Sequence, residues 1–214
     1  MRLRSFLALG LGLILTLTGC QTAYYSTMAK FGYEKRDLLK KAVEAARSEQ
    51  KDTQETFKDA LTRLKDLYAF QGGDLEKQYN KLKSEFESCE FQAKSVRKRI
   101  QNMDGIASDL FAEWDKEILQ ISTPALAADS RQKLSETRAR FQQLSASLHQ
   151  SETAMQPVLR SFQDHVLYLK HNLNAAAIGS LKGEAANIQK DIERLITQMN
   201  GSISEAEAFI KTLK

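Results

Sequence analysis

Hydrophobic residues recur along most of this chain at alternating spacings of four and three. Between residues 75 and 114 this spacing holds for more than five heptads, which is typical of a long helix with one apolar seam. The seam residues are Leu75, Tyr79, Leu82, Phe86, Cys89, Ala93, Val96, Ile100, Met103, Ala107, Leu110 and Trp114. This pattern predicts a helix of roughly 45 residues, which would be about 70 Å long.

Three other segments follow the same period. In the third segment the seam runs through Leu134, Phe141, Leu144, Leu148, Met155, Val158, Phe162, Leu169, Leu173 and Ala176, with Thr137, Ser151 and His165 at its polar positions. The fourth carries Leu181, Ala185, Ile188, Ile192, Leu195, Met199, Ala206, Phe209 and Leu213. The first, from about residue 24 to 70, has Leu38, Ala42, Ala46, Phe57, Ala60, Leu64 and Leu67, interrupted by a polar middle between residues 49 and 55. We expect this segment to be helical throughout and weakest at that middle.

The predicted helices are separated by recognisable turn signals. Gly72 and Gly73 before Asp74 indicate a helix end followed by a new N-cap. Residues 122–124, Ser-Thr-Pro, place a capping residue before a proline at the first helical position, so the third helix starts there or near Asp129. A third turn is expected between residues 172 and 183, around Gly179–Ser180. Pro157 lies inside the third segment without a change of heptad phase, which predicts a kink rather than a helix end.

These features predict an all-α fold. Short turns place consecutive helices antiparallel, so we expect an elongated antiparallel helical bundle or coiled coil of about four long helices, forming a single domain over residues 20–214. Composition agrees, since the 214 residues include only two prolines and ten glycines and 27% are charged.

The first twenty residues have the order of a secretory signal. Arg2 and Arg4 precede an apolar run from residue 6 to 17 that is too short to span a bilayer comfortably. Small residues then lead to a cysteine, and the four residues Leu17, Thr18, Gly19 and Cys20 resemble the bacterial lipobox. That resemblance implies removal of residues 1–19, a diacylglycerol thioether on Cys20 and acylation of its amine. The alternative is an ordinary thiol in an uncleaved anchor.

An acylated Cys20 would tether the chain to a membrane without spanning it. Two or more acyl chains anchor a protein stably, whereas one chain does so only marginally. Gln21 stands where lipoproteins retained at the inner membrane carry aspartate, so we expect the periplasmic face of the outer membrane. Without Arg2 and Arg4 the chain has 29 Lys and Arg against 27 Asp and Glu. This nearly neutral net charge does not indicate that the protein binds nucleic acid.

The residues after the cysteine combine aromatic and basic side chains, which favour the headgroup region of a membrane. The candidate membrane-proximal residues are Tyr24, Tyr25, Lys30, Phe31, Lys35 and Arg36. Packing of the same residues on the end of the bundle is an equally good explanation. A denser basic cluster, at Lys94 and residues 97–99, is better explained as a solvated helix face than as a nucleic-acid site.

Nothing in the spacing points to catalysis. His149, His165 and His171 have no partner at ligand spacing, and no phosphate loop or nucleophile elbow occurs. We expect no enzymatic activity, no metal and no cofactor other than the acyl groups. We expect Cys89 to be buried as a small hydrophobic residue. The alternative is that Cys89, as the one free thiol once Cys20 is acylated, forms a disulfide between two protomers, so a homo-oligomer is possible.

The lipobox, "YYSTMAKFGYEKRDLL" at 24–39, "GGDLEKQY" at 72–79 and "LKHNLNAAAIGSLKGE" at 169–184 resemble a family of uncharacterised proteobacterial lipoproteins defined by a domain of unknown function. The resemblance implies an all-helical envelope protein with no assigned activity. We expect a structural or interaction module with an envelope protein as partner. The alternative is a membrane-active protein whose amphipathic helices rearrange on a bilayer.

Overall fold

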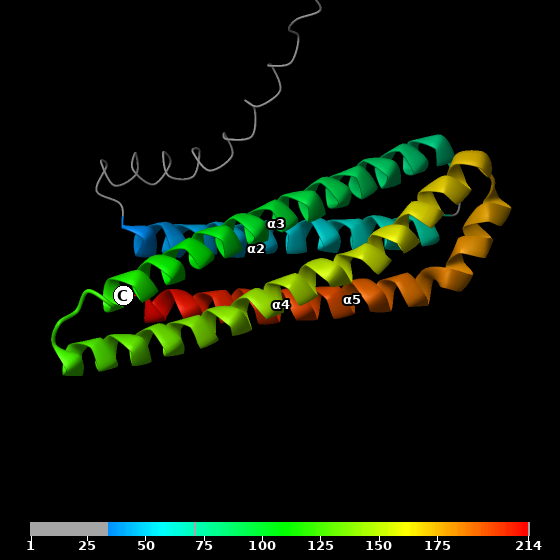
Figure 1. The fold of residues 1–214 in the computed structure, drawn as a ribbon. Coiled ribbons are helices and arrows are strands. Elements are labelled where there is room, and N and C mark those ends of the chain that lie inside the picture. Colours follow the sequence, from blue (N-terminus) through cyan, green and yellow to red (C-terminus); the bar gives the residue numbers. More distant parts are fainter. Residues whose placement is uncertain (1–33, 71, 214) are drawn as a thin grey trace, which may run out of the picture.

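Four long helices make up the part of the chain that the computed structural model describes, residues 34–70 and 72–213. They are α2 (Lys35–Tyr68), α3 (Leu75–Ile118), α4 (Pro124–His171) and α5 (Ala175–Thr212). Each helix runs antiparallel to the next along the chain, and α5 returns to pack beside α2, which closes a ring of four (Figure 1). The predicted all-α antiparallel bundle is confirmed, and no strand occurs in the described ranges.

The predicted seams form the core. In α3 the seam is buried between Leu82 and Ala107 apart from half-buried Phe86, and its ends at Leu75, Tyr79, Leu110 and Trp114 pack partly buried against the core. Three edge-to-face pairs tie the helices together, each with ring centroids 5.7 Å apart: Phe86–Phe162, Phe111–Phe141 and Phe141–Phe209. The third seam was predicted too long, because Leu173 and Ala176 are exposed beyond the end of α4.

Two of the three predicted turns are confirmed. Gly73 has a φ of 120°, a conformation that favours glycine because a Cβ is strained there. The Asp74 carboxylate then accepts a hydrogen bond of 2.9 Å from the Lys77 backbone N–H and caps α3. At the second turn α4 begins at Pro124. This is the first of the two predicted starts; the other was near Asp129. The helix continues through Pro157, so that proline does not end it.

The third turn is shorter than predicted and is made by asparagines. It comprises residues 172–174, and Gly179, Ser180 and Gly183 lie within α5. The Asn174 side chain accepts a hydrogen bond of 3.0 Å from the Ala177 backbone N–H, which caps the new helix. Glycine was the wrong guide here because an isolated glycine costs a helix only about 1 kcal/mol, which the packing of neighbouring residues can offset.

The helix ends are not flush. Because Phe209, one turn from the end of α5, lies against Phe141, residues 124–137 of α4 extend about 20 Å past α5 at 1.5 Å per residue. Figure 1 shows that the start of α4 and the end of α3 project beyond the start of α2 and the end of α5. The α3–α4 hairpin therefore overhangs the end of the bundle at which α2 begins. Within the described residues, no helix combines the length and apolarity needed to cross a bilayer.

Candidate interaction site at the N-terminal end of the bundle

The two predicted membrane-proximal residues that the structure describes lie in the first turn of α2. Lys35 Nζ is 3.1 Å from Glu113 Oε1 on α3, so this lysine ties the start of the chain's first described helix to the overhanging hairpin. Arg36 beside it is exposed. The other predicted contact residues, Tyr24, Tyr25, Lys30 and Phe31, and the lipobox residues with Cys20 lie outside the described residues.

A pocket of about 760 Å³ lies where α2 and α5 stop beneath the hairpin. It is lined by all four helices: Glu34, Lys35, Arg36, Leu110, Glu113, Trp114, Glu117, Lys133, Glu136, Thr137, Arg140, Thr212 and Leu213. The half-buried Trp114 indole donates a hydrogen bond of 2.9 Å to Ser130 Oγ, which joins α3 to α4 beside the pocket. The pocket lining combines cations, carboxylates and apolar groups, a mixture that can bind a polar chain or headgroup.

The tip of the hairpin exposes large apolar side chains. Leu119 is 79% exposed and Leu126 is 60% exposed, and both flank the turn between α3 and α4. Heptad spacing does not predict them, because it identifies buried positions. A signal was present, since residues 118–128, ILQISTPALAA, form an uncharged run in a chain that is 27% charged.

Polar residues also occupy the middle of the core. Gln50 and Ser151 are fully buried, and Ser151 Oγ donates to Gln50 Oε1 at 3.3 Å across the bundle. Gln54 Nε2 donates to Asn200 Oδ1 at 2.8 Å and to the Ile196 carbonyl at 3.2 Å. The first segment is helical through its polar middle, as predicted, and the amides there face α4 and α5. Such a layer fixes the register of helices that apolar seams alone allow to slide.

The basic cluster on α3 is largely compensated. Arg97 donates two hydrogen bonds, of 2.6 and 2.9 Å, to the Glu152 carboxylate of α4. Arg99 lies 3.2 Å from Glu49 of α2, and Lys94 pairs with Glu90. Three of the four basic residues in the cluster are thus paired with carboxylates, which leaves little positive charge free to bind a nucleic acid.

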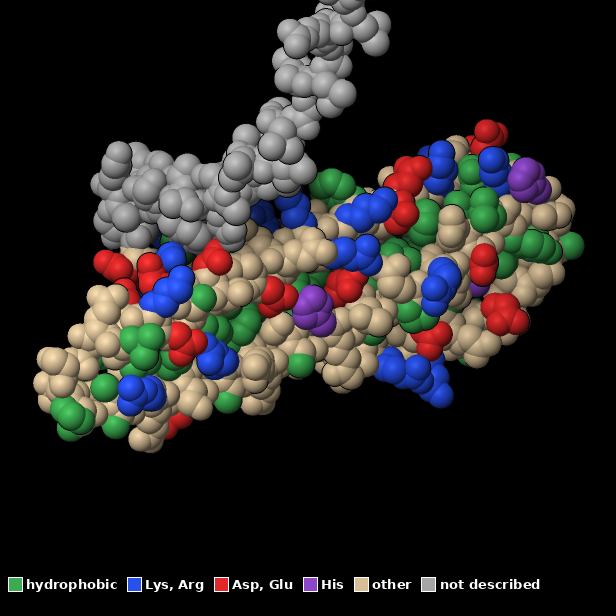
Figure 2. Space-filling view, viewed as in Figure 1, with side chains coloured by type: hydrophobic (Ala, Val, Ile, Leu, Met, Phe, Trp, Pro, Cys, Tyr) green, Lys and Arg blue, Asp and Glu red, His purple; other side chains and the backbone are tan. Residues whose placement is uncertain are grey.

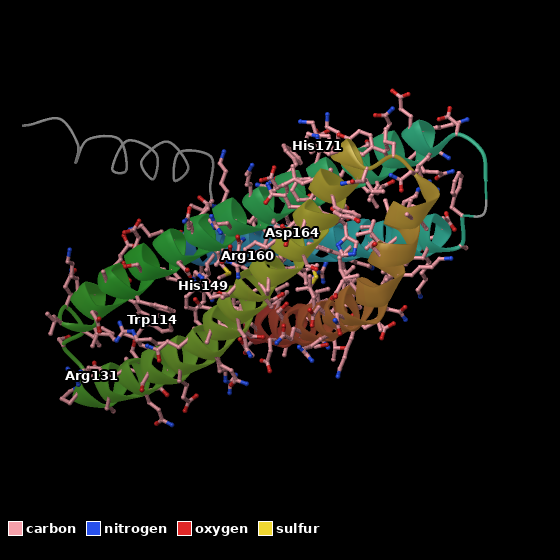
Figure 3. The ribbon with its side chains drawn as sticks, turned by 90° about the vertical axis from the view of Figure 1, so that its right-hand side faces the viewer. Trp114, Arg131, His149, Arg160, Asp164 and His171 are labelled. Carbon is pink, nitrogen blue, oxygen red and sulfur yellow. The ribbon has the colours of Figure 1, made fainter. Side chains whose placement is uncertain are left out.

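The histidines do not converge on one site. Figure 3 shows His149, Arg160, Asp164 and His171 spaced along α4 toward the end opposite Trp114 and Arg131. His149 Nε2 lies 2.8 Å from Asp104 Oδ2, but Ser145 donates to the other oxygen of the same carboxylate at 2.8 Å. The carboxylate thus separates serine from histidine, whereas nucleophile activation requires the base beside the hydroxyl. Across the ranges 34–70 and 72–213 no group of three metal-ligating side chains occurs.

His165 is buried on the seam, as predicted for a core residue. Its Nδ1 lies 2.9 Å from the Ser161 carbonyl, and its ring meets the ring of Tyr68 edge-on with centroids 6.2 Å apart. Burial and the nearby Glu184 carboxylate raise the pKa of the Tyr68 hydroxyl above its usual range. The Tyr68 hydroxyl therefore stays protonated near neutral pH, and the two rings contribute packing between α2 and α4.

Cys89 is fully buried in the seam of α3, with Sγ 3.9 Å from the Thr56 carbonyl of α2. Burial, together with the Glu85 and Asp59 carboxylates, raises the pKa of its thiol to about 12. The geometry favours the small-hydrophobe interpretation over a disulfide between protomers, because the sulfur cannot reach another molecule without local opening of the bundle.

We therefore expect Cys89 to resist thiol reagents in the folded chain. In a Cys20→Ser variant, where it is the one thiol, Ellman's reagent at about pH 8 should leave Cys89 unmodified, because little thiolate forms when the pKa is raised this far. Addition of concentrated urea should then release a full equivalent of colour. Rapid reaction in the folded state, or a dimer on a non-reducing gel, would contradict the burial argument.

Residues 24–213 match the model of a family described as proteins of unknown function, DUF2959. The chain belongs to this family. No curated protein and no solved structure matches the chain. The DUF2959 region starts eleven residues before α2 and includes all four helices, so the family definition includes the bundle, the pocket and the hairpin tip.

Proposed function

We propose that this DUF2959 protein is a lipid-anchored structural or interaction protein of the periplasmic face of the outer membrane, without catalytic activity. The observation that carries the proposal is the order of residues 1–20, which ends in Leu17-Thr18-Gly19-Cys20. Acylation at Cys20 would place the anchor fourteen residues ahead of Glu34 and hence near the end of the bundle where α2 begins. A proteobacterial source is part of the same proposal.

The bundle suits a spacer that works by position. Its longest helix, α4, has 48 residues, which corresponds to about 72 Å at 1.5 Å per residue. With one end held at a membrane, the opposite end and the sides remain available to an envelope protein. The far end exposes Leu167, Tyr168 and Leu173, and the sides carry interspersed charges of both signs (Figure 2). Such surfaces favour protein partners over substrates.

Loss of the anchor is the direct test of this proposal. Replacing Cys20 by alanine removes the acceptor sulfur, so we expect the protein to move from the outer-membrane fraction to the soluble periplasmic fraction. Mass spectrometry of the wild-type mature N-terminus should find an acylated cysteine as the first residue. Crosslinking in intact cells followed by affinity capture should recover an envelope protein with the wild type, at reduced yield with Cys20→Ala.

Replacing Cys89 by alanine is the matched control, because that cysteine is buried and far along the chain from the signal sequence. This variant should stay in the membrane fraction and keep its partner. An unmodified Cys20 in the wild type, or unchanged fractionation of Cys20→Ala, would contradict the proposed anchoring.

A further inference from the structure

The overhanging hairpin ends in a small apolar tip that its own chain does not cover. Leu119 is the C-cap residue of α3, and Leu126 lies in the first turn of α4. Together with Phe91 they have the largest exposed fractions among the large apolar side chains that the structure describes. Ile121, which lies between them in the chain, is half-buried and packs against the core. Figure 2 shows hydrophobic side chains at this outermost end of the molecule.

The tip lies at the end of the bundle where the described chain starts. The ion pair between Lys35 and Glu113 fixes α2's first turn against α3 only five residues before Ile118. Thirteen residues separate Cys20 from Glu34, and a chain of that length spans at most about 45 Å. A membrane holding Cys20 is therefore within reach of the tip, and the tether would keep the two at a high effective concentration.

Basic side chains border the tip. Lys116 precedes Leu119 by three residues and so shares its helix face, and Arg131 projects from α4 at the same end (Figure 3). Among the described residues neither has an ion-pair partner, whereas the nearby Arg138 and Lys133 pair with Asp115 and Asp129. Leucines at the tip with unpaired cations behind them match a phospholipid surface, where phosphates lie above the hydrocarbon.

We propose that the α3–α4 hairpin tip, through Leu119 and Leu126, inserts into the phospholipid surface that holds the acylated Cys20, with Lys116 and Arg131 on the lipid phosphates. This inference rests on the proposed anchor. A second contact point would hold the bundle at a defined angle to the membrane, which one flexible tether cannot do. A second copy of the chain is a poorer occupant, because stable interfaces bury about 800 Å² per partner and a two-helix tip offers far less.

The test uses the acylated protein in vesicles of phosphatidylethanolamine and phosphatidylglycerol. A fluorescent label is placed on Leu119→Cys in a Cys89→Ala background, and the matched control carries it on Leu173→Cys at the opposite end. Lipids with a nitroxide on the acyl chain should remove most of the emission at position 119 and leave position 173 unchanged. Adding Leu126→Gln to the first variant should restore emission, and circular dichroism should show the same helix content in all variants.

Vesicle flotation separates the two proposals. Protein that floats while positions 119 and 173 respond equally to nitroxide lipid would overturn tip insertion and leave the anchor intact. A label at 119 shielded from aqueous iodide but not reached by the nitroxide would reveal a protein occupant, which also overturns it. Protein that fails to float would overturn the anchor and the tip contact together.

Discussion

Replacing Phe162 by alanine should lower the free energy of unfolding by about 3–5 kcal/mol, because a buried aromatic loses its transfer free energy and leaves a cavity. Phe162 is fully buried on α4, and its ring meets that of Phe86 on α3 edge-on at 5.7 Å. The same change should lower the melting temperature by roughly 10 °C for a chain of this size. Urea unfolding followed by circular dichroism measures both stability and cooperativity.

Phe91 supplies the control for this prediction. It lies on α3 as well, but it is 67% exposed, so Phe91→Ala should change stability by no more than about 0.5 kcal/mol. Equal losses for the two variants would mean that the seam of α4 does not form the core described here.

Replacing Pro157 by alanine should raise stability, by about 2 kcal/mol. Proline is about 3 kcal/mol less favourable than alanine inside a helix, and part of the gain is offset because proline also stiffens the unfolded chain. Pro157 is exposed within α4 and cannot donate a backbone hydrogen bond to the carbonyl of Thr153. The midpoint of urea unfolding should therefore move to higher concentration.

The exposed Gln163 on the same helix provides the comparison. Gln163→Ala keeps the backbone hydrogen bond and should alter stability by only a few tenths of a kcal/mol. Destabilisation by Pro157→Ala would indicate that a bend at this proline is needed for Val158 and Leu159 to reach the core, where both are buried.

The bundle combines apolar seams that set the helix faces with polar residues that distinguish one alignment from another. Gln50 Nε2 is buried without a hydrogen-bond partner among the described residues, although Ser151 satisfies its carbonyl oxygen. A buried donor without a hydrogen-bond partner lowers the stability of the fold. The role of this amide is therefore better explained as fixing the register between α2 and α4 than as stabilising the bundle. The Arg97–Glu152 pair joins α3 to α4 next to Ser151 and contributes to the alignment of these helices.

The sequence singled out two of the residues at this end of the bundle and missed others. Lys35 and Arg36 were predicted to lie near a membrane, which stays a prediction, and the structure places both in the lining of the pocket. The pocket itself was not predictable, because it exists only where α2 and α5 stop short of the hairpin. Leu119 and Leu126 were missed for a similar reason, since an apolar residue at a helix end has no seam position that tells whether another helix covers it.

By itself the sequence determined the four helices, two of their three turns, the buried seams of α3 and α5, and the signal-like order that ends at Cys20. These features are local: heptad spacing, a glycine with a left-handed backbone and a capping side chain act within a few residues along the chain. Only the tertiary structure decided that the polar middle of α2 is buried, that the third turn is three residues long, and that the α3–α4 hairpin overhangs. Each of these depends on where a helix meets residues far away in sequence, because burial and helix length are set by contacts between helices rather than by the period of any one of them.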